Sequence, residues 1–146
     1  MDYQIYKSFK EISDDVKKEI IDFLYNHLDQ YRDNKEDIEK AIDFALGKSC
    51  DLGGFVLKGE SGGETAGVVV VNRTGMEGYI PENILVYIAV DSKFRGKGYG
   101  KQLMNEAIKH AEGDIALHVE PDNPARYLYE KLGFTSKYLE MRYAKS

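Results

Sequence analysis

Glycine and basic residues alternate over a short stretch in the second half of this chain. The run Arg95-Gly-Lys-Gly-Tyr-Gly100 lies between Lys93 and Lys101, and no acidic residue falls between those two lysines. The whole chain has a formal net charge of −5, so this local positive charge stands out. A glycine-rich turn at the start of a helix presents free backbone N–H groups and a favourable helix dipole to an anion. The stretch therefore predicts a binding site for a phosphate group.

Two familiar phosphate-binding motifs do not fit this stretch. A P-loop places Ser or Thr directly after its lysine, whereas Gly98 follows Lys97 and Gln102 follows Lys101. A dinucleotide-binding turn spaces its glycines G-x-G-x-x-G, whereas the spacing here is G-x-G-x-G. A steric explanation stays open, in which the glycines only allow a tight connection between a strand and a helix.

A second informative stretch covers residues 117–134. It combines a short strand, the turn Asp122-Asn123, a helix that carries Tyr129, and the closing run Leu-Gly-Phe134. Together the two stretches resemble the GNAT superfamily of N-acetyltransferases, whose pyrophosphate motif is Arg or Gln, two residues, Gly, one residue, and Gly or Ala. Both motifs stand in the order and spacing of that family. The earlier part of the chain matches the family only in its order of elements.

The resemblance implies an acetyl-CoA-dependent N-acetyltransferase that moves an acetyl group to a primary amine by direct transfer in a ternary complex. Backbone N–H groups of the turn would bind the CoA pyrophosphate, with Arg95 and Lys101 adding charge. Two strands would splay apart, and main-chain groups near Ile88 and Val90 would bind the pantetheine arm and the acetyl carbonyl. The cofactor-binding residues implied in this way are Ile88, Val90, Arg95, Gly96, Lys97, Gly98, Tyr99, Gly100, Lys101 and Asn123.

Two side chains are candidates for moving protons. Tyr129 holds the position of the family's general acid, which protonates the departing CoA thiolate, and the alternative is a core aromatic residue. His118 is a candidate general base, because an imidazole titrates near neutral pH, and an ordinary polar strand residue is an equal alternative. Glu120, Glu82 and an ordered water are the other candidate bases.

Apolar periodicity and capping residues predict the elements that must position these groups. Strands are expected near residues 2–9, 55–58, 65–72, 84–90, 115–119 and 138–143, and helices after the caps Ser13 and Asn34 and at 98–112 and 124–132. The order β-α-α-β-β-β-α-β-α-β predicts a three-layer α/β fold. The resemblance implies a mixed, mostly antiparallel sheet with helices on both faces.

Composition is that of an ordinary soluble protein, and residues 1–146 fit a single domain with 42% hydrophobic and 31% charged residues. The single cysteine, Cys50, cannot form an intrachain disulfide, and no signal peptide is apparent, so a cytoplasmic location is expected. No metal-ligand spacing, membrane-length apolar run or basic nucleic-acid stripe is present. The expected partner is a small-molecule or peptide amine, and homodimerisation stays open.

A function of a different class fits the same residues. The chain could be a non-catalytic module that binds an acyl-CoA, either as a sensor or as an interaction domain. Both functions predict acetyl-CoA binding, and only the enzyme releases the thiol when an amine is supplied. The identity of that amine is not encoded in the two motifs, although Asp29, Asp33, Glu77 and Glu82 mildly favour a cationic acceptor.

Overall fold

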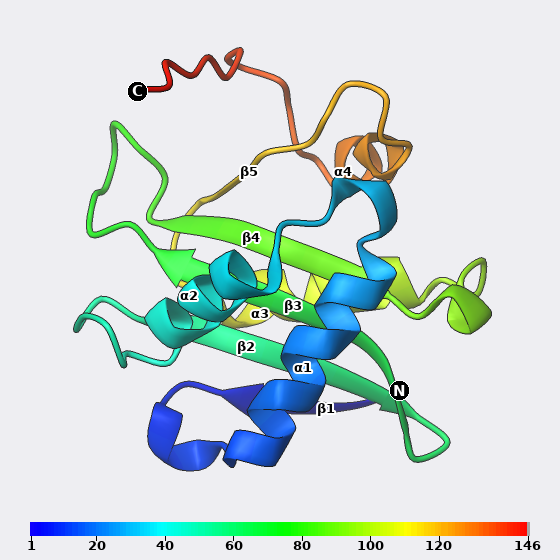
Figure 1. The fold of residues 1–146 in the computed structure, drawn as a ribbon. Helices are drawn as coiled ribbons and strands as arrows, with labels where there is room; N and C mark the ends of the chain where they lie inside the picture. Colours follow the sequence, from blue (N-terminus) through cyan, green and yellow to red (C-terminus); the bar gives the residue numbers. More distant parts are fainter. Residues whose placement is uncertain (146) are drawn as a thin grey trace.

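The computed structural model describes residues 1–145, which form a five-stranded sheet with helices on both faces (Figure 1). The strands lie in the order β1-β2-β3-β4-β5, and all neighbours are antiparallel except the parallel pair β4 and β5. The strands are β1 (Asp2–Tyr6), β2 (Gly54–Ser61), β3 (Glu64–Arg73), β4 (Asn83–Val90) and β5 (Ile115–Leu117). The α-helices are α1 (Asp14–His27), α2 (Lys35–Ala45), α3 (Tyr99–His110) and α4 (Ala125–Lys131), and the 3-10 turns are η1 (Phe9–Glu11), η2 (Asp29–Tyr31) and η3 (Ser92–Phe94).

The first two helices begin where the sequence predicts. The Ser13 side chain accepts a hydrogen bond from the Val16 N–H, and the Asn34 side chain accepts one from the Asp37 N–H. Each cap satisfies an N–H group that has no partner inside the first turn of its helix. The capping residues therefore determine where α1 and α2 start, and α1 ends at His27, on the rim of the candidate site described below.

The centre of the sheet is buried on both faces, as the continuous apolar run in β3 predicts. Val68 and Val70 pack with α1 and α2, whereas Val69 and Val71 pack with α3, and none of the four is exposed. Figure 1 shows α1 and α2 in front of the sheet and α3 behind it. The mixed, three-layer fold with helices on both faces is confirmed.

Strand β5 pairs with only the first three residues of β4, so the rest of β4 has a free edge on this side, as the expected splay requires. Their pairing covers only Asn83–Ile115, Ile84–Ala116 and Leu85–Leu117. Beyond it, β4 continues to Val90 paired with β3 on one side only. A register shift in β4 places Leu85 opposite Val71 and Tyr87 opposite Val70, so one extra residue is inserted at Val86. The bulge lies directly after Leu85, the last residue of β4 that pairs with β5.

The closing strand expected at residues 138–143 is not formed, so the observed order within residues 1–145 ends with α4. The expectation rested on the resemblance to the family, but a strand also needs a neighbouring strand with which to form hydrogen bonds. The edge strand β5 is three residues long, shorter than the expected 115–119, and offers little edge for pairing. Four large side chains of the segment remain 81–91% exposed, namely Tyr138, Leu139, Met141 and Tyr143.

Candidate active site

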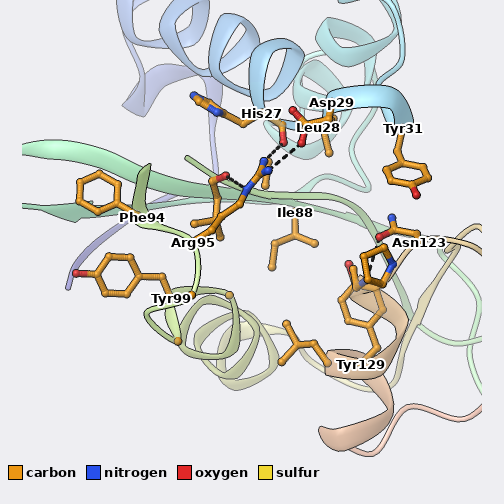
Figure 2. Close-up of a pocket in the computed structure, with 18 residues that line it drawn as sticks. His27, Leu28, Asp29, Tyr31, Ile88, Phe94, Arg95, Tyr99, Asn123 and Tyr129 are labelled. Carbon is orange, nitrogen blue, oxygen red and sulfur yellow. Dashed lines mark hydrogen bonds and ion pairs between the residues drawn. The ribbon is translucent and has the colours of Figure 1, made fainter. Parts of the chain in front are cut away.

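A pocket of about 390 Å³ lies along the last residues of β4, beyond the part of β4 that pairs with β5. Its walls come from the end of α1 and the following turn η2, the last residues of β4, the glycine-rich turn, and the starts of α3 and α4. Figure 2 shows Ile88 in the middle, with Arg95 and Tyr99 on one side of it and Asn123 and Tyr129 on the other. The fold therefore brings both sequence motifs to one cavity.

The glycine-rich turn has the geometry of an anion site. Gly96 and Gly98 have φ angles of 78° and 80°, in the left-handed region that favours glycine. Among residues 1–145, we find no hydrogen-bond acceptor for the backbone N–H groups from Gly96 to Lys101. Gly98 is the N-cap of α3, a 12-residue helix, so its dipole adds to these free donors.

The basic side chains of the turn are less available than the sequence suggests. Lys93 pairs with Glu64 at 3.1 Å, and Arg95 pairs with Asp29 at 2.9 Å. The Lys97 ammonium lies 5.6 Å from the centre of the Phe94 ring. Lys97 and Lys101 are exposed and do not line the pocket. The free backbone donors, rather than the cations, are the main feature that an anion would meet.

Tyr129 lies in the wall of the pocket and is 8% exposed. It belongs to α4, whose inward face also supplies Leu128. Burial raises the pKa of Tyr129 to about 12, so its hydroxyl keeps its proton around neutral pH. A buried, protonated phenol in a cavity is suited to donating a proton, and the ring also belongs to the core, so its position fits both alternatives that the sequence left open.

Asn123 also lines the pocket, just before α4. Its Oδ1 atom accepts a hydrogen bond from the Ala125 N–H at 2.9 Å. That bond fixes the side chain and leaves its NH₂ group as the donor for a ligand. Tyr99 is fixed in a similar way, because its hydroxyl lies 3.0 Å from Oγ of Ser61 on β2.

The candidate bases lie outside this pocket. His118 follows the last residue of β5, is exposed, and is not among the pocket-lining residues. Glu120 is exposed as well. Glu82 accepts hydrogen bonds from the backbone N–H groups of Asp114 and Gly78, and these bonds lower the pKa of its carboxyl group. Glu82 therefore organises the loops around it, and the structure brings neither it nor His118 to the cavity.

Substitution of His118 by alanine is therefore expected to leave the pH dependence of kcat/KM unchanged. The loss of rate should be far smaller than the roughly 10²–10⁴-fold that a positioned base contributes. A pH–rate profile of wild type and His118→Ala, measured with the same amine, checks this. Loss of the ascending limb in the variant would restore His118 as the base.

Four further pocket residues come from the end of α1 and the stretch between the first two helices, which the resemblance assigns to the acceptor site, namely His27, Leu28, Asp29 and Tyr31. Phe94 also lines the pocket and was missed by sequence reasoning, because no motif position points to it. His27 lines the pocket, with its ring centre 4.5 Å from that of Phe23 and its Nε2 atom 3.6 Å from Oδ2 of Asp91.

The described part of the chain, residues 1–145, contains no group of three or more His, Cys, Asp or Glu side chains placed to hold a metal ion. None of its helices is both long enough and apolar enough to cross a membrane.

Comparison with known proteins shows the family of this chain. A model of the acetyltransferase (GNAT) family matches residues 17–134. An N-alpha-acetyltransferase RimI from Mycobacterium tuberculosis is 33% identical over 85 residues, which are 57% of this chain and only 53% of that protein.

Solved structures with the same fold cover nearly all of the chain. An aminoglycoside 6'-N-acetyltransferase from Acinetobacter haemolyticus has a TM-score of 0.71 and 15% identity, over 100% of this chain and 99% of its own. A ribosomal-protein-alanine N-acetyltransferase from Brucella melitensis has a TM-score of 0.66 and 18% identity, also over 100% and 99%. Since the family model matches most of the residues, including both motifs, this chain belongs to the acetyltransferase (GNAT) family.

Proposed function

We propose that the protein transfers the acetyl group of acetyl-CoA directly to a primary amine. The observation that carries the proposal is the row of free N–H groups from Gly96 to Lys101, placed beside the open edge of β4 in a cavity that also contains Tyr129. A phosphate site, an unpaired strand edge and a buried phenol are the three features that a CoA thioester and its reaction require.

The residues of the pocket fit the two ends of acetyl-CoA. The pyrophosphate binds at the turn, because a Cβ built at Gly96 or Gly98 meets no atom within 4 Å and the approach to the backbone is open. The pantetheine arm lies along the free edge of β4, where main-chain groups near Ile88 and Val90 bind it as an added strand. Asn123 closes the far side of the arm.

The reaction is a single acyl transfer. The amine nitrogen attacks the acetyl carbonyl carbon, and the backbone N–H near Ile88 stabilises the oxyanion. The C–S bond then breaks, and the Tyr129 hydroxyl gives its proton to the departing thiolate sulfur. The pKa of Tyr129 is about 12. Burial also raises the pKa of a thiol, so the pKa values of the phenol and of the CoA thiol are brought closer together in the cavity. Water takes the proton of the amine, because His118, Glu120 and Glu82 all lie outside the pocket.

The acceptor is a primary amine of a peptide or a small molecule, in a cytoplasmic setting. The names of the proteins above state such amines: an N-alpha group, a ribosomal-protein alanine and the 6'-nitrogen of an aminoglycoside. The acidic residues that suggested a cationic acceptor in the sequence are largely engaged within the protein. Asp29 pairs with Arg95, Asp33 accepts from Tyr87, and Glu82 accepts from two backbone N–H groups. Acidity alone is therefore weak support for a strongly cationic acceptor.

Acetyl-CoA is expected to bind much more tightly than an acetyl-pantetheine thioester that lacks the phosphates. The free N–H groups of the turn supply charge-assisted hydrogen bonds to the pyrophosphate, each worth about 1.5–3 kcal/mol. Calorimetry with both ligands measures the difference. Equal affinities would show that the turn does not bind phosphate.

Release of free thiol from acetyl-CoA, followed across a panel of peptides, polyamines and aminoglycosides, tests catalysis itself. Tight binding of acetyl-CoA with no thiol release from any amine would favour the non-catalytic acyl-CoA-binding module.

A further inference from the structure

The side chain of Arg95 joins two parts of the chain that are far apart in sequence. Its Nη1 atom donates to Oδ2 of Asp29 at 2.9 Å, and its Nη2 atom donates to the His27 carbonyl at 2.8 Å. Its Nε atom donates to the Val90 carbonyl at 3.2 Å, which holds the guanidinium at the end of β4. Figure 2 shows these bonds reaching from the turn before α3 to the end of α1.

The segment that Arg95 reaches, residues 28–33, is held at two further points around the pocket. The Tyr31 hydroxyl donates to the Asp122 carbonyl in the loop before α4 at 3.4 Å, and the Tyr87 hydroxyl of β4 donates to Asp33 at 2.5 Å. Asp29 has a φ of 56°, and it is the only non-glycine residue among residues 1–145 with a positive φ. A left-handed aspartate costs conformational energy, so outside contacts must hold segment 28–33 in this shape.

We propose that Arg95 is a positioning residue that couples the two sides of the pocket, so that acetyl-CoA bound at the turn also holds segment 28–33 in place. The inference rests on the proposed function. Three of the guanidinium's bonds go to Val90, His27 and Asp29, so its charge is committed to this junction rather than to the anion. A phosphate that orders the turn also orders the backbone that carries Arg95, and the entropy of fixing Arg95 is then already lost when it binds the segment.

The expected coupling is modest in size. The Arg95 and Asp29 side chains are 43% and 55% exposed, and an ion pair at such a position contributes little by itself. The bond to the His27 carbonyl adds to it, because it is charge-assisted and lies at the end of α1, where the helix dipole favours a cation. The Nε2 atom of His27 also lies 3.6 Å from Oδ2 of Asp91, which is a second contact between the end of α1 and the segment after β4. We therefore expect effects of roughly three- to tenfold, the scale of one ordinary hydrogen bond, because solvent screens these exposed charges.

Hydrogen exchange of the full chain, with and without acetyl-CoA, measures this coupling. The reporters in segment 28–33 are the N–H groups of Tyr31 and Arg32, which bond to the carbonyls of Leu28 and Asp29 at 3.1 and 3.3 Å. In the wild type, acetyl-CoA should slow exchange both in the turn and at these reporters. In Arg95→Met, the reporters should exchange roughly three- to tenfold faster without ligand. In this variant acetyl-CoA should no longer slow exchange at the reporters, but it should still slow exchange in the turn.

Two further variants separate coupling from general loss of charge. Asp29→Asn removes the ion-pair partner, leaves the turn unchanged, and keeps a residue that tolerates the left-handed region. It should reproduce the loss of coupling, and the double variant Arg95→Met/Asp29→Asn should be no worse than either single one. Lys93→Met is the matched control, since Lys93 stands in the same turn but pairs with Glu64, and it should keep the coupling.

The possible results distinguish this inference from the proposed function. If acetyl-CoA still slows the reporters in Arg95→Met, or protects only the turn in the wild type, the coupling is wrong and the acetyl-CoA site stands. If acetyl-CoA does not protect even the turn, the proposed function fails and the coupling fails with it.

Discussion

Replacing Tyr129 by phenylalanine is expected to lower kcat by about 10²–10⁴-fold, the contribution of a positioned general acid. Affinity for acetyl-CoA should stay close to that of the wild type. The substitution removes one hydroxyl and keeps the ring, which packs 6.1 Å from Phe134. Single-turnover rates measure the loss directly, since slow product release would hide part of it in kcat.

The control for this variant is Tyr127→Phe. Tyr127 lies on the same helix two residues earlier, is 63% exposed and does not line the pocket, so its hydroxyl should be dispensable. Because the pKa of Tyr129 is about 12, the wild-type rate should show no fall that depends on this group as pH rises through neutrality. A Tyr129→Phe enzyme with full single-turnover activity would mean that Tyr129 serves only the core and that solvent protonates the thiolate.

The second large effect is expected from Gly98→Val, which should abolish measurable binding of acetyl-CoA while the protein stays folded. Gly98 has a φ of 80°, and a left-handed valine costs roughly 1–2 kcal/mol. The backbone at the start of α3 must therefore distort, or the branched side chain must occupy the space in front of the free N–H groups. Either change removes the phosphate site. Calorimetry with acetyl-CoA measures the binding.

The matched control is Gly62→Val in the turn between β2 and β3. Gly62 also has a positive φ, 61°, and open space around a Cβ, but it lies outside the pocket. The two variants carry a similar backbone strain, so thermal unfolding should shift by a similar amount in both. Only Gly98→Val should lose acetyl-CoA binding, and retained affinity in that variant would mean that the glycines serve only the tight connection.

Local patterns in the sequence determined much of this protein. Helix starts depend on contacts within one turn, so Ser13 and Asn34 could be identified as caps from the sequence. The continuous apolar run of β3 predicted a strand buried on both faces, because burial follows directly from side-chain hydrophobicity. The glycine-rich turn and the Tyr129 helix were recognisable for the same reason, since each motif is contained in a short continuous segment.

The tertiary structure alone decided how these pieces meet. The sequence predicts Arg95 as a phosphate ligand. In the structure it pairs with Asp29, 66 residues away in the chain, and no local pattern encodes that contact. His118 has suitable chemistry, yet β5 ends before it and leaves it exposed. The segment 138–143 alternates like a strand and stays unpaired, because strand formation depends on hydrogen bonds to a neighbour rather than on side-chain pattern. Residue type determined what each group can do, and long-range packing determined which groups share a cavity.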